Sequence, residues 1–102
     1  MRVIAKSALT KFWPTLPRGE QESARTALYG WYGIVTDAEW TNFSDIKATF
    51  NTADWVGSGK VVFDVGGNKY RIVCLIGFRT GRIFILFVGT HKQYDLIDVT
   101  TI

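Results

Sequence analysis

Residues 60–88 decide the fold of this chain, and they read KVVFDVGGNKYRIVCLIGFRTGRIFILFV. The stretch holds three apolar runs rich in β-branched and aromatic residues, which are typical of strands. Gly66-Gly67-Asn68 separates the first two runs with residues that tolerate positive φ, and a turn containing Thr80-Gly81 separates the last two. The pattern predicts antiparallel strands at residues 60–65, 69–76 and 82–88.

The third of these runs is apolar on both faces after Arg82. Such a run is typical of a central strand that is buried on both sides. We therefore expect residues 82–88 to form the most buried strand of the sheet. The preceding segment, residues 54–59, contains two glycines and is expected to be a loop.

The half of the chain before this sheet has a helical pattern. From Glu20 to about Val35, apolar residues recur three and four positions apart, which predicts an amphipathic helix. Ser7 and Ser44 are candidate N-caps of two shorter helices. Residues 1–4 are expected to form a short strand.

With 102 residues and 47% hydrophobic composition, the chain suffices for one compact domain, residues 1–102. Helices followed by strands favour an α+β fold over alternating βαβ units. We predict an antiparallel β-meander, with a short N-terminal strand, packed against two to three N-terminal helices.

The formal net charge of +3 is confined to the second half of the sequence. Residues 1–56 carry six bases and six acids, whereas residues 57–102 carry six bases and three acids. An anionic partner such as nucleic acid is therefore expected to bind the second half.

Cysteine and histidine usage narrows the class of protein further. Cys74 is the only cysteine, so no internal disulfide can form and a reducing cytoplasm is the simplest location. No apolar run approaches about 18 residues, so we expect neither secretion nor a membrane span. With one histidine and one cysteine, no zinc site is expected, and any catalysis is predicted to proceed without metal or cofactor.

The residues that could carry chemistry follow the third predicted strand, in the segment Gly89-Thr90-His91-Lys92-Gln93-Tyr94-Asp95. Thr90 and Gln93 have the spacing of a capping box, so a short helix should begin at His91 and place Tyr94 on the same face. Taken alone, a histidine such as His91 is more often a surface residue in a turn, and a tyrosine such as Tyr94 more often packs its ring at the edge of the core.

The register of the last hairpin decides which side chains join His91. Lys69 and Arg71 share one face of their strand, because side chains alternate with period two. A two-residue turn would set Arg71 opposite Thr90, beside His91, whereas a three-residue turn would send Arg71 to the other face. We expect function to require the two-residue turn.

Lys69 and Arg71, together with the His91 imidazole and the Tyr94 hydroxyl, would supply the groups that RNA cleavage without a metal ion requires. That reaction needs a base for the ribose 2′-OH, positive charge on the phosphate, and an acid for the departing 5′-oxygen. Protonation of His91 beside two cations would be disfavoured, which suits a base better than an acid.

Residues 67–73 and 87–95 resemble the two signature segments of HigB-type toxins, which belong to the RelE superfamily of ribosome-dependent mRNA endonucleases. Residues 45–48 and 60–63 are similar to the same family. The resemblance extends over nearly the whole chain, and the Gly-Thr-His-x-x-Tyr-Asp segment is its most specific part.

This resemblance implies a small RelE-like fold and the toxin of a type II toxin-antitoxin system. Such a toxin is a metal-independent endoribonuclease that enters the ribosomal A site and cuts mRNA through 2′-OH attack, so it inhibits translation and growth. Its partners would be the ribosome, mRNA and a cognate helix-turn-helix antitoxin, with which it would repress its own operon in the cytoplasm.

The resemblance assigns catalytic roles to Arg71, His91 and Tyr94. It places Lys69 and Lys92 at RNA-binding positions. The chain departs from the family pattern at Leu86, where relatives often have a basic residue, so one phosphate contact is expected to be missing. We predict RNA contacts for four bases of the second half: Lys60, Lys69, Arg82 and Lys92.

Two other hypotheses remain open at this point. In the first, the chain is a non-catalytic module that binds single-stranded RNA through the basic face of the sheet and by stacking on Tyr70, Phe84 or Phe63. In the second, the chain is an interaction protein whose tryptophans dock a partner, although core packing is the more usual role of tryptophans in a domain of this size. These tryptophans are Trp13, Trp31, Trp40 and Trp55.

Overall fold

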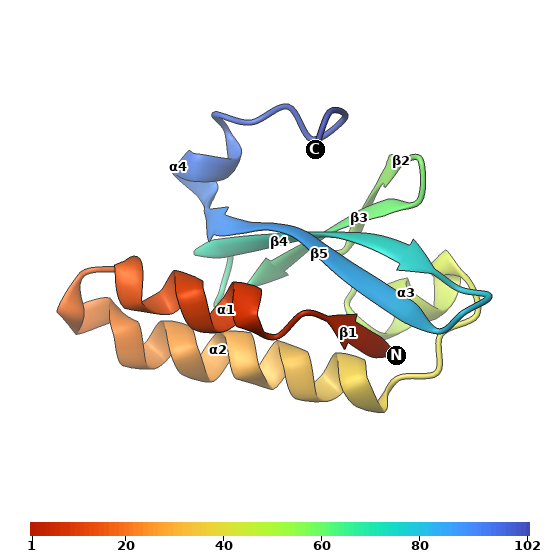
Figure 1. The fold of residues 1–102 in the computed structure, drawn as a ribbon, viewed down its shortest axis with the longest axis horizontal. Coiled ribbons are helices and arrows are strands. Elements are labelled where there is room, and N and C mark those ends of the chain that lie inside the picture. Colours follow the sequence, from red (N-terminus) through yellow and green to blue (C-terminus); the bar gives the residue numbers. More distant parts are fainter.

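The computed structural model describes all residues 1–102 and shows a five-stranded sheet with α1 and α2 stacked against one of its faces (Figure 1). The fold is α+β, as predicted. The elements in chain order are β1 (Arg2–Ile4), α1 (Ser7–Phe12), the 3-10 turn η1 (Trp13–Thr15), α2 (Arg18–Asp37), α3 (Phe43–Thr49), β2 (Asp54–Gly57), β3 (Lys60–Val65), β4 (Tyr70–Gly77), β5 (Arg82–Thr90) and α4 (His91–Tyr94). None of the helices is both long enough and apolar enough to cross a membrane.

The strands lie in the order β1-β5-β4-β3-β2. Strands β2 to β5 form the antiparallel meander, and β1 pairs with β5 in parallel, with Arg2 opposite Arg82. The prediction of a loop at residues 54–59 is wrong, because Asp54–Gly57 forms β2 and pairs with β3. Positive φ at Gly57, Ser58 and Gly59 closes this additional hairpin, and Trp55 and Val56 favour extended backbone.

The most buried strand is β4 rather than β5. Five of the eight residues of β4 are buried, whereas only Ile83 and Gly89 are buried in β5. The prediction that residues 82–88 are buried on both sides is therefore wrong. The physical reason is that the helices α1 and α2 cover only one face of the sheet (Figure 1), so apolar residues on the other face of β5 stay partly exposed.

The helical layer follows the predicted pattern, with shifted ends. Helix α2 extends to Asp37 and buries Ala24, Leu28, Trp31 and Val35, which lie on one face. The two predicted serine caps are wrong. Ser7 is the first residue of α1 and makes no capping contact, and Asn42, not Ser44, caps α3 by accepting a hydrogen bond from the Asp45 N–H.

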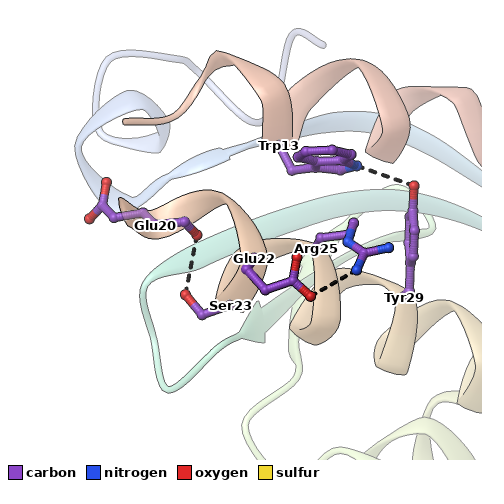
Figure 2. A network of polar contacts seen from close by, with 6 residues as sticks. All are labelled: Trp13, Glu20, Glu22, Ser23, Arg25 and Tyr29. Carbon is purple, nitrogen blue, oxygen red and sulfur yellow. Dashed lines mark hydrogen bonds and ion pairs between the residues drawn. The ribbon is translucent and has the colours of Figure 1, made fainter. Parts of the chain in front are cut away.

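Polar contacts join η1 to α2 on the outside of the helical layer (Figure 2). The indole N–H of Trp13 donates to the Tyr29 hydroxyl at 3.2 Å, and the Arg25 guanidinium lies 6.0 Å from the Trp13 ring. Arg25 also pairs with Glu22 at 2.8 Å. This exposed ion pair contributes little to stability. The Gln21 side-chain amide adds two contacts to this junction, since it donates to the carbonyls of Pro14 and Leu16 at 3.2 and 2.9 Å.

The inner face of the sheet, which packs on the helices, carries an aromatic cluster around Phe63. Its ring centroid lies 5.4 Å from Trp31, 5.4 Å from Phe50 and 6.2 Å from Trp40. Trp31 and Trp40 are buried, whereas Trp55 is 46% exposed. Two of the four tryptophans therefore serve core packing.

Candidate active site

We use the term outer face for the side of the sheet opposite the helices, where Asp64, Arg71 and Val73 lie. Asp64 and Arg71 are direct partners in the β3–β4 ladder, and Arg71 is the partner of Gly89 in the β4–β5 ladder. Helix α4 begins two residues after Gly89, with His91. In Figure 1, α4 and the C-terminal segment lie on this outer side of the sheet, away from α1 and α2.

The register of the last hairpin matches neither predicted turn. Gly77 pairs with Arg82, so the loop is the four residues Phe78–Gly81. The register then shifts between Val73 and Cys74, because β5 has one extra residue, Leu86, which is 38% exposed. Arg71 consequently faces Gly89 rather than Thr90.

Arg71 and His91 nevertheless meet, so the expectation that function requires a two-residue turn is wrong. Arg71 and Gly89 are direct ladder partners and point to the same face, so His91, two residues after Gly89, begins α4 on that same side of the sheet. The predicted capping box is present: Thr90 Oγ1 accepts from the Gln93 N–H at 3.1 Å, and Gln93 Oε1 accepts from the Thr90 N–H at 2.8 Å. This box sets the start of α4 at His91.

The backbone is crowded by two side chains where β5 meets α4, at Gly89. A Cβ atom at Gly89 would lie 2.6 Å from Phe87 Cζ and 2.8 Å from Gln93 Oε1. Both neighbours support the site, since Gln93 closes the capping box and the Phe87 ring packs 6.4 Å from Tyr94.

The guanidinium of Arg71 is the centre of the cluster. Its Nε–H donates to His91 Nε2 at 3.2 Å, and Nε lies 3.0 Å from Asp64 Oδ1. Its Cζ lies 4.6 Å from the centroid of the Tyr94 ring, which is a cation–π distance. The two terminal amino groups of Arg71 make no hydrogen bond within the protein. The structure therefore brings Arg71, His91 and Tyr94 together, with the guanidinium held through Nε.

Asp64 completes the cluster, although the sequence reasoning did not single it out. Its Oδ1 lies 3.7 Å from His91 Nε2, and its side chain is 19% exposed. A signal for it was present in the sequence. Asp64 and Arg71 are equidistant from the Gly67-Asn68 turn, so a symmetric hairpin makes them cross-strand partners.

The predicted RNA-binding residues divide into two groups. Lys69 adjoins the site, since its carbonyl accepts from the His91 N–H at 3.4 Å, and Lys92 follows His91 on α4. Lys60 and Arg82 lie at the opposite ends of β3 and β5 from Asp64 and Thr90. The Lys60 ammonium donates to the carbonyls of Val99 and Thr100 at 3.2 and 3.3 Å, so it anchors the C-terminal segment.

Two of the three rings proposed for RNA stacking are unavailable. Phe63 and Tyr70 are 0% and 3% exposed and belong to the core on the inner face. Only Phe84, opposite Leu75 in the ladder, lies on the outer face. The hypothesis that RNA bases stack on this sheet therefore retains only one of its three proposed aromatic rings. No three His, Cys, Asp or Glu side chains lie close enough together to share a metal ion.

Comparison with known proteins identifies the family. The profile of the HigB toxin family, described as the RelE-like toxic component of a toxin-antitoxin system, matches residues 24–97, a range that includes the whole cluster. The mRNA interferase HigB of Escherichia coli O6:H1 (strain CFT073) is 26% identical over 76 residues, which are 68% of this chain and 69% of that protein. The mRNA interferase toxin HigB of Escherichia coli K12 and the mRNA interferase HigB of Shigella flexneri are each 47% identical over 34 residues, one third of either chain. This chain therefore belongs to the HigB toxin family, the RelE-like toxic components of toxin-antitoxin systems.

Proposed function

We propose that this chain is the toxin of a toxin-antitoxin system and acts as an endoribonuclease on mRNA, with the Arg71–His91–Tyr94 cluster as its active site. The observation that carries the proposal is the state of Arg71: its Nε is engaged by His91 and Asp64, and both terminal amino groups are left for a ligand. Two parallel N–H donors match the oxygens of a phosphodiester. The relatives named mRNA interferases support RNA as the source of that phosphate.

The reaction we propose is attack of the ribose 2′-oxygen on the adjacent phosphorus. The 2′-OH gives up its proton to His91, the new O–P bond forms, and the P–O5′ bond breaks. The products are a 2′,3′-cyclic phosphate and a 5′-hydroxyl end. Arg71 neutralises the charge that builds on the non-bridging oxygens, which is the usual role of a positioned cation in such a transition state.

Tyr94 serves this site in two ways. Its ring lies against the guanidinium, which orients the plane of Arg71. Its hydroxyl is the proton donor that we assign to the leaving 5′-oxygen. Because protein groups supply the positive charge, the base and the acid, we propose that cleavage is independent of metal ions.

We further propose that the ribosome presents the message to this toxin. A net charge of +3 is small for a protein that must capture RNA unaided, since affinity for phosphates rises with the number of neutralised charges. Lys69 and Lys92, beside the site, are the bases that we assign to the RNA backbone in the ribosomal A site. A cytoplasmic helix-turn-helix antitoxin, the kind that the family resemblance implies, would silence the toxin.

Induction of the chain in growing cells, followed by mapping of 5′-hydroxyl mRNA ends, tests the proposal. We expect growth arrest and new 5′-hydroxyl ends with the native sequence, and neither with His91→Ala. Lys11→Ala, at an exposed position on α1, is the matched control and should remain toxic. Normal growth and no new ends with the native sequence would refute the proposed function. Assays with purified ribosomes, with and without EDTA, separate ribosome dependence from metal dependence.

A further inference from the structure

One carboxylate oxygen of the cluster lacks a hydrogen-bond donor. Asp64 Oδ1 is buried and accepts no hydrogen bond, although Arg71 Nε lies at 3.0 Å and His91 Nε2 at 3.7 Å. The geometry explains this. Arg71 Nε carries a single hydrogen, and that hydrogen is directed to His91 Nε2.

The hydrogen bond from Arg71 also defines the tautomer of His91. A ring nitrogen that accepts a hydrogen bond carries no proton, so the neutral ring has its N–H at Nδ1. In this arrangement neither nitrogen is ready to act as a base, because Nε2 is occupied and Nδ1 is protonated. Nδ1 has no hydrogen-bond partner in the protein, and the His91 side chain is 38% exposed.

We propose that Asp64 is a positioning residue that switches His91 to the reactive tautomer when phosphate binds, an inference that rests on the proposed function. A phosphate that binds the terminal amino groups of Arg71 draws the guanidinium toward itself and takes its Nε–H away from His91 Nε2. The ring then exchanges its Nδ1 proton with solvent and gains one at Nε2, which donates to Asp64 Oδ1. Nδ1 is now unprotonated and accepts the proton of the ribose 2′-OH.

The physical drive for this exchange is the unsatisfied oxygen itself. A buried carboxylate oxygen without a donor is unfavourable, and the Nε2–H tautomer supplies the donor. The ring carries one proton before and after the switch, so no net protonation is needed until the 2′-OH is attacked. The imidazolium that then forms lies beside the Asp64 carboxylate, which stabilises it, and its extra proton is returned to solvent.

The only histidine of the chain makes the tautomer directly measurable. We would record the ring ¹⁵N shifts of His91 by NMR, with and without saturating inorganic phosphate, in the native chain and in Asp64→Asn. The native chain should change from Nδ1–H to Nε2–H on phosphate binding, and Asp64→Asn should not. An unchanged tautomer in the native chain while Arg71 signals report phosphate binding would overturn the proposal, as would the same change in Asp64→Asn.

Cleavage by the same variants gives the second readout. Asp64→Asn should lower the cleavage rate by up to about 10⁴-fold, which is the loss that a wrong histidine tautomer causes when the aspartate of a Ser-His-Asp triad is replaced by asparagine. Asp54→Asn, an exposed aspartate on β2 with the same charge change, should leave the rate unaltered. A native rate in Asp64→Asn would sink the inference and leave the proposed function standing. If the native chain does not cleave RNA, the proposed function fails, and the phosphate titration still decides the role of Asp64.

Discussion

The two faces of the sheet are built from the same strands, but the inner face forms the hydrophobic core and the outer face carries the candidate active site. Phe63 and Ile72 are completely buried on the inner face, whereas their chain neighbours Asp64 and Arg71 form the site on the outer face. Alternation of side chains along a strand separates these neighbours by the thickness of the sheet. Stability therefore depends mainly on the inner-face residue of each neighbouring pair and chemistry on the outer-face residue, and substitutions on the two faces test that separation.

The largest effect is expected from Phe63→Ala on the inner face. Phe63 contacts Trp31, Trp40 and Phe50, so its removal leaves a cavity in the aromatic cluster. We expect the free energy of unfolding, measured by urea denaturation, to fall by about 3–5 kcal/mol. Leu75→Ala, at a 37% exposed outer-face position, should cost much less. Equal losses in the two variants would contradict the assignment of the core to one face.

Arg71→Ala should have the next largest effect, with a loss of cleavage and a smaller loss of stability. Loss of one positioned donor to a developing oxyanion typically lowers the rate about 10²–10³-fold. The variant also leaves Asp64 without its charge partner, which destabilises the fold. We therefore predict that Arg71→Ala/Asp64→Asn regains the stability that Arg71→Ala loses, and stays inactive. Recovery of cleavage in the double variant would remove Arg71 from the active site.

Gly89→Ala tests whether the outer face tolerates crowding where β5 meets α4. The new methyl would displace Phe87 and Gln93, so we expect a loss of about 1–3 kcal/mol in unfolding free energy and a lower cleavage rate. Gly33→Ala is the matched control, because its Cβ meets nothing and lies within α2. That variant should gain about 0.5–1 kcal/mol and keep full activity. A neutral result at Gly89 would show that α4 can shift without cost.

The effect that is smallest near neutral pH concerns ionisation and belongs to the inner face. Burial raises the pKa of the Cys74 thiol well above its ordinary value, and burial also raises the pKa of Tyr70. Both groups ionise first in the unfolded chain, so their contribution to stability is complete below the unfolded pKa of the thiol and falls as pH rises past it. For Cys74 the slope can reach about 1.4 kcal/mol per pH unit.

Urea titrations between pH 8 and pH 11 would measure that slope. Cys74→Ala should flatten it and leave only the part that Tyr70 contributes. The same slope in both chains would mean that the thiol is not shielded from solvent in the folded state.

Local signals in the sequence predicted much of the framework. The apolar runs of residues 60–88 predicted β3, β4 and β5, and the spacing of Ala24, Leu28 and Trp31 predicted α2. Thr90 and Gln93 predicted the start of α4 through their capping box. These predictions are correct because each depends on residues that are close together in the sequence. The conformational preferences of such residues do not require contacts with distant parts of the chain.

By itself, then, the sequence determined the helices, every strand except β2, and the candidate residues Arg71, His91 and Tyr94. Only the tertiary structure decided that the last hairpin has a four-residue loop and an extra residue at Leu86, that β1 joins β5 in parallel, and that Asp64 lies close to both Arg71 and His91. Register and bulges depend on packing between strands that meet only in the folded chain, and one shifted residue changes every cross-strand partner. The role of Asp64 likewise depends on the tertiary structure, because only the folded chain brings Arg71 and His91 close to its carboxylate.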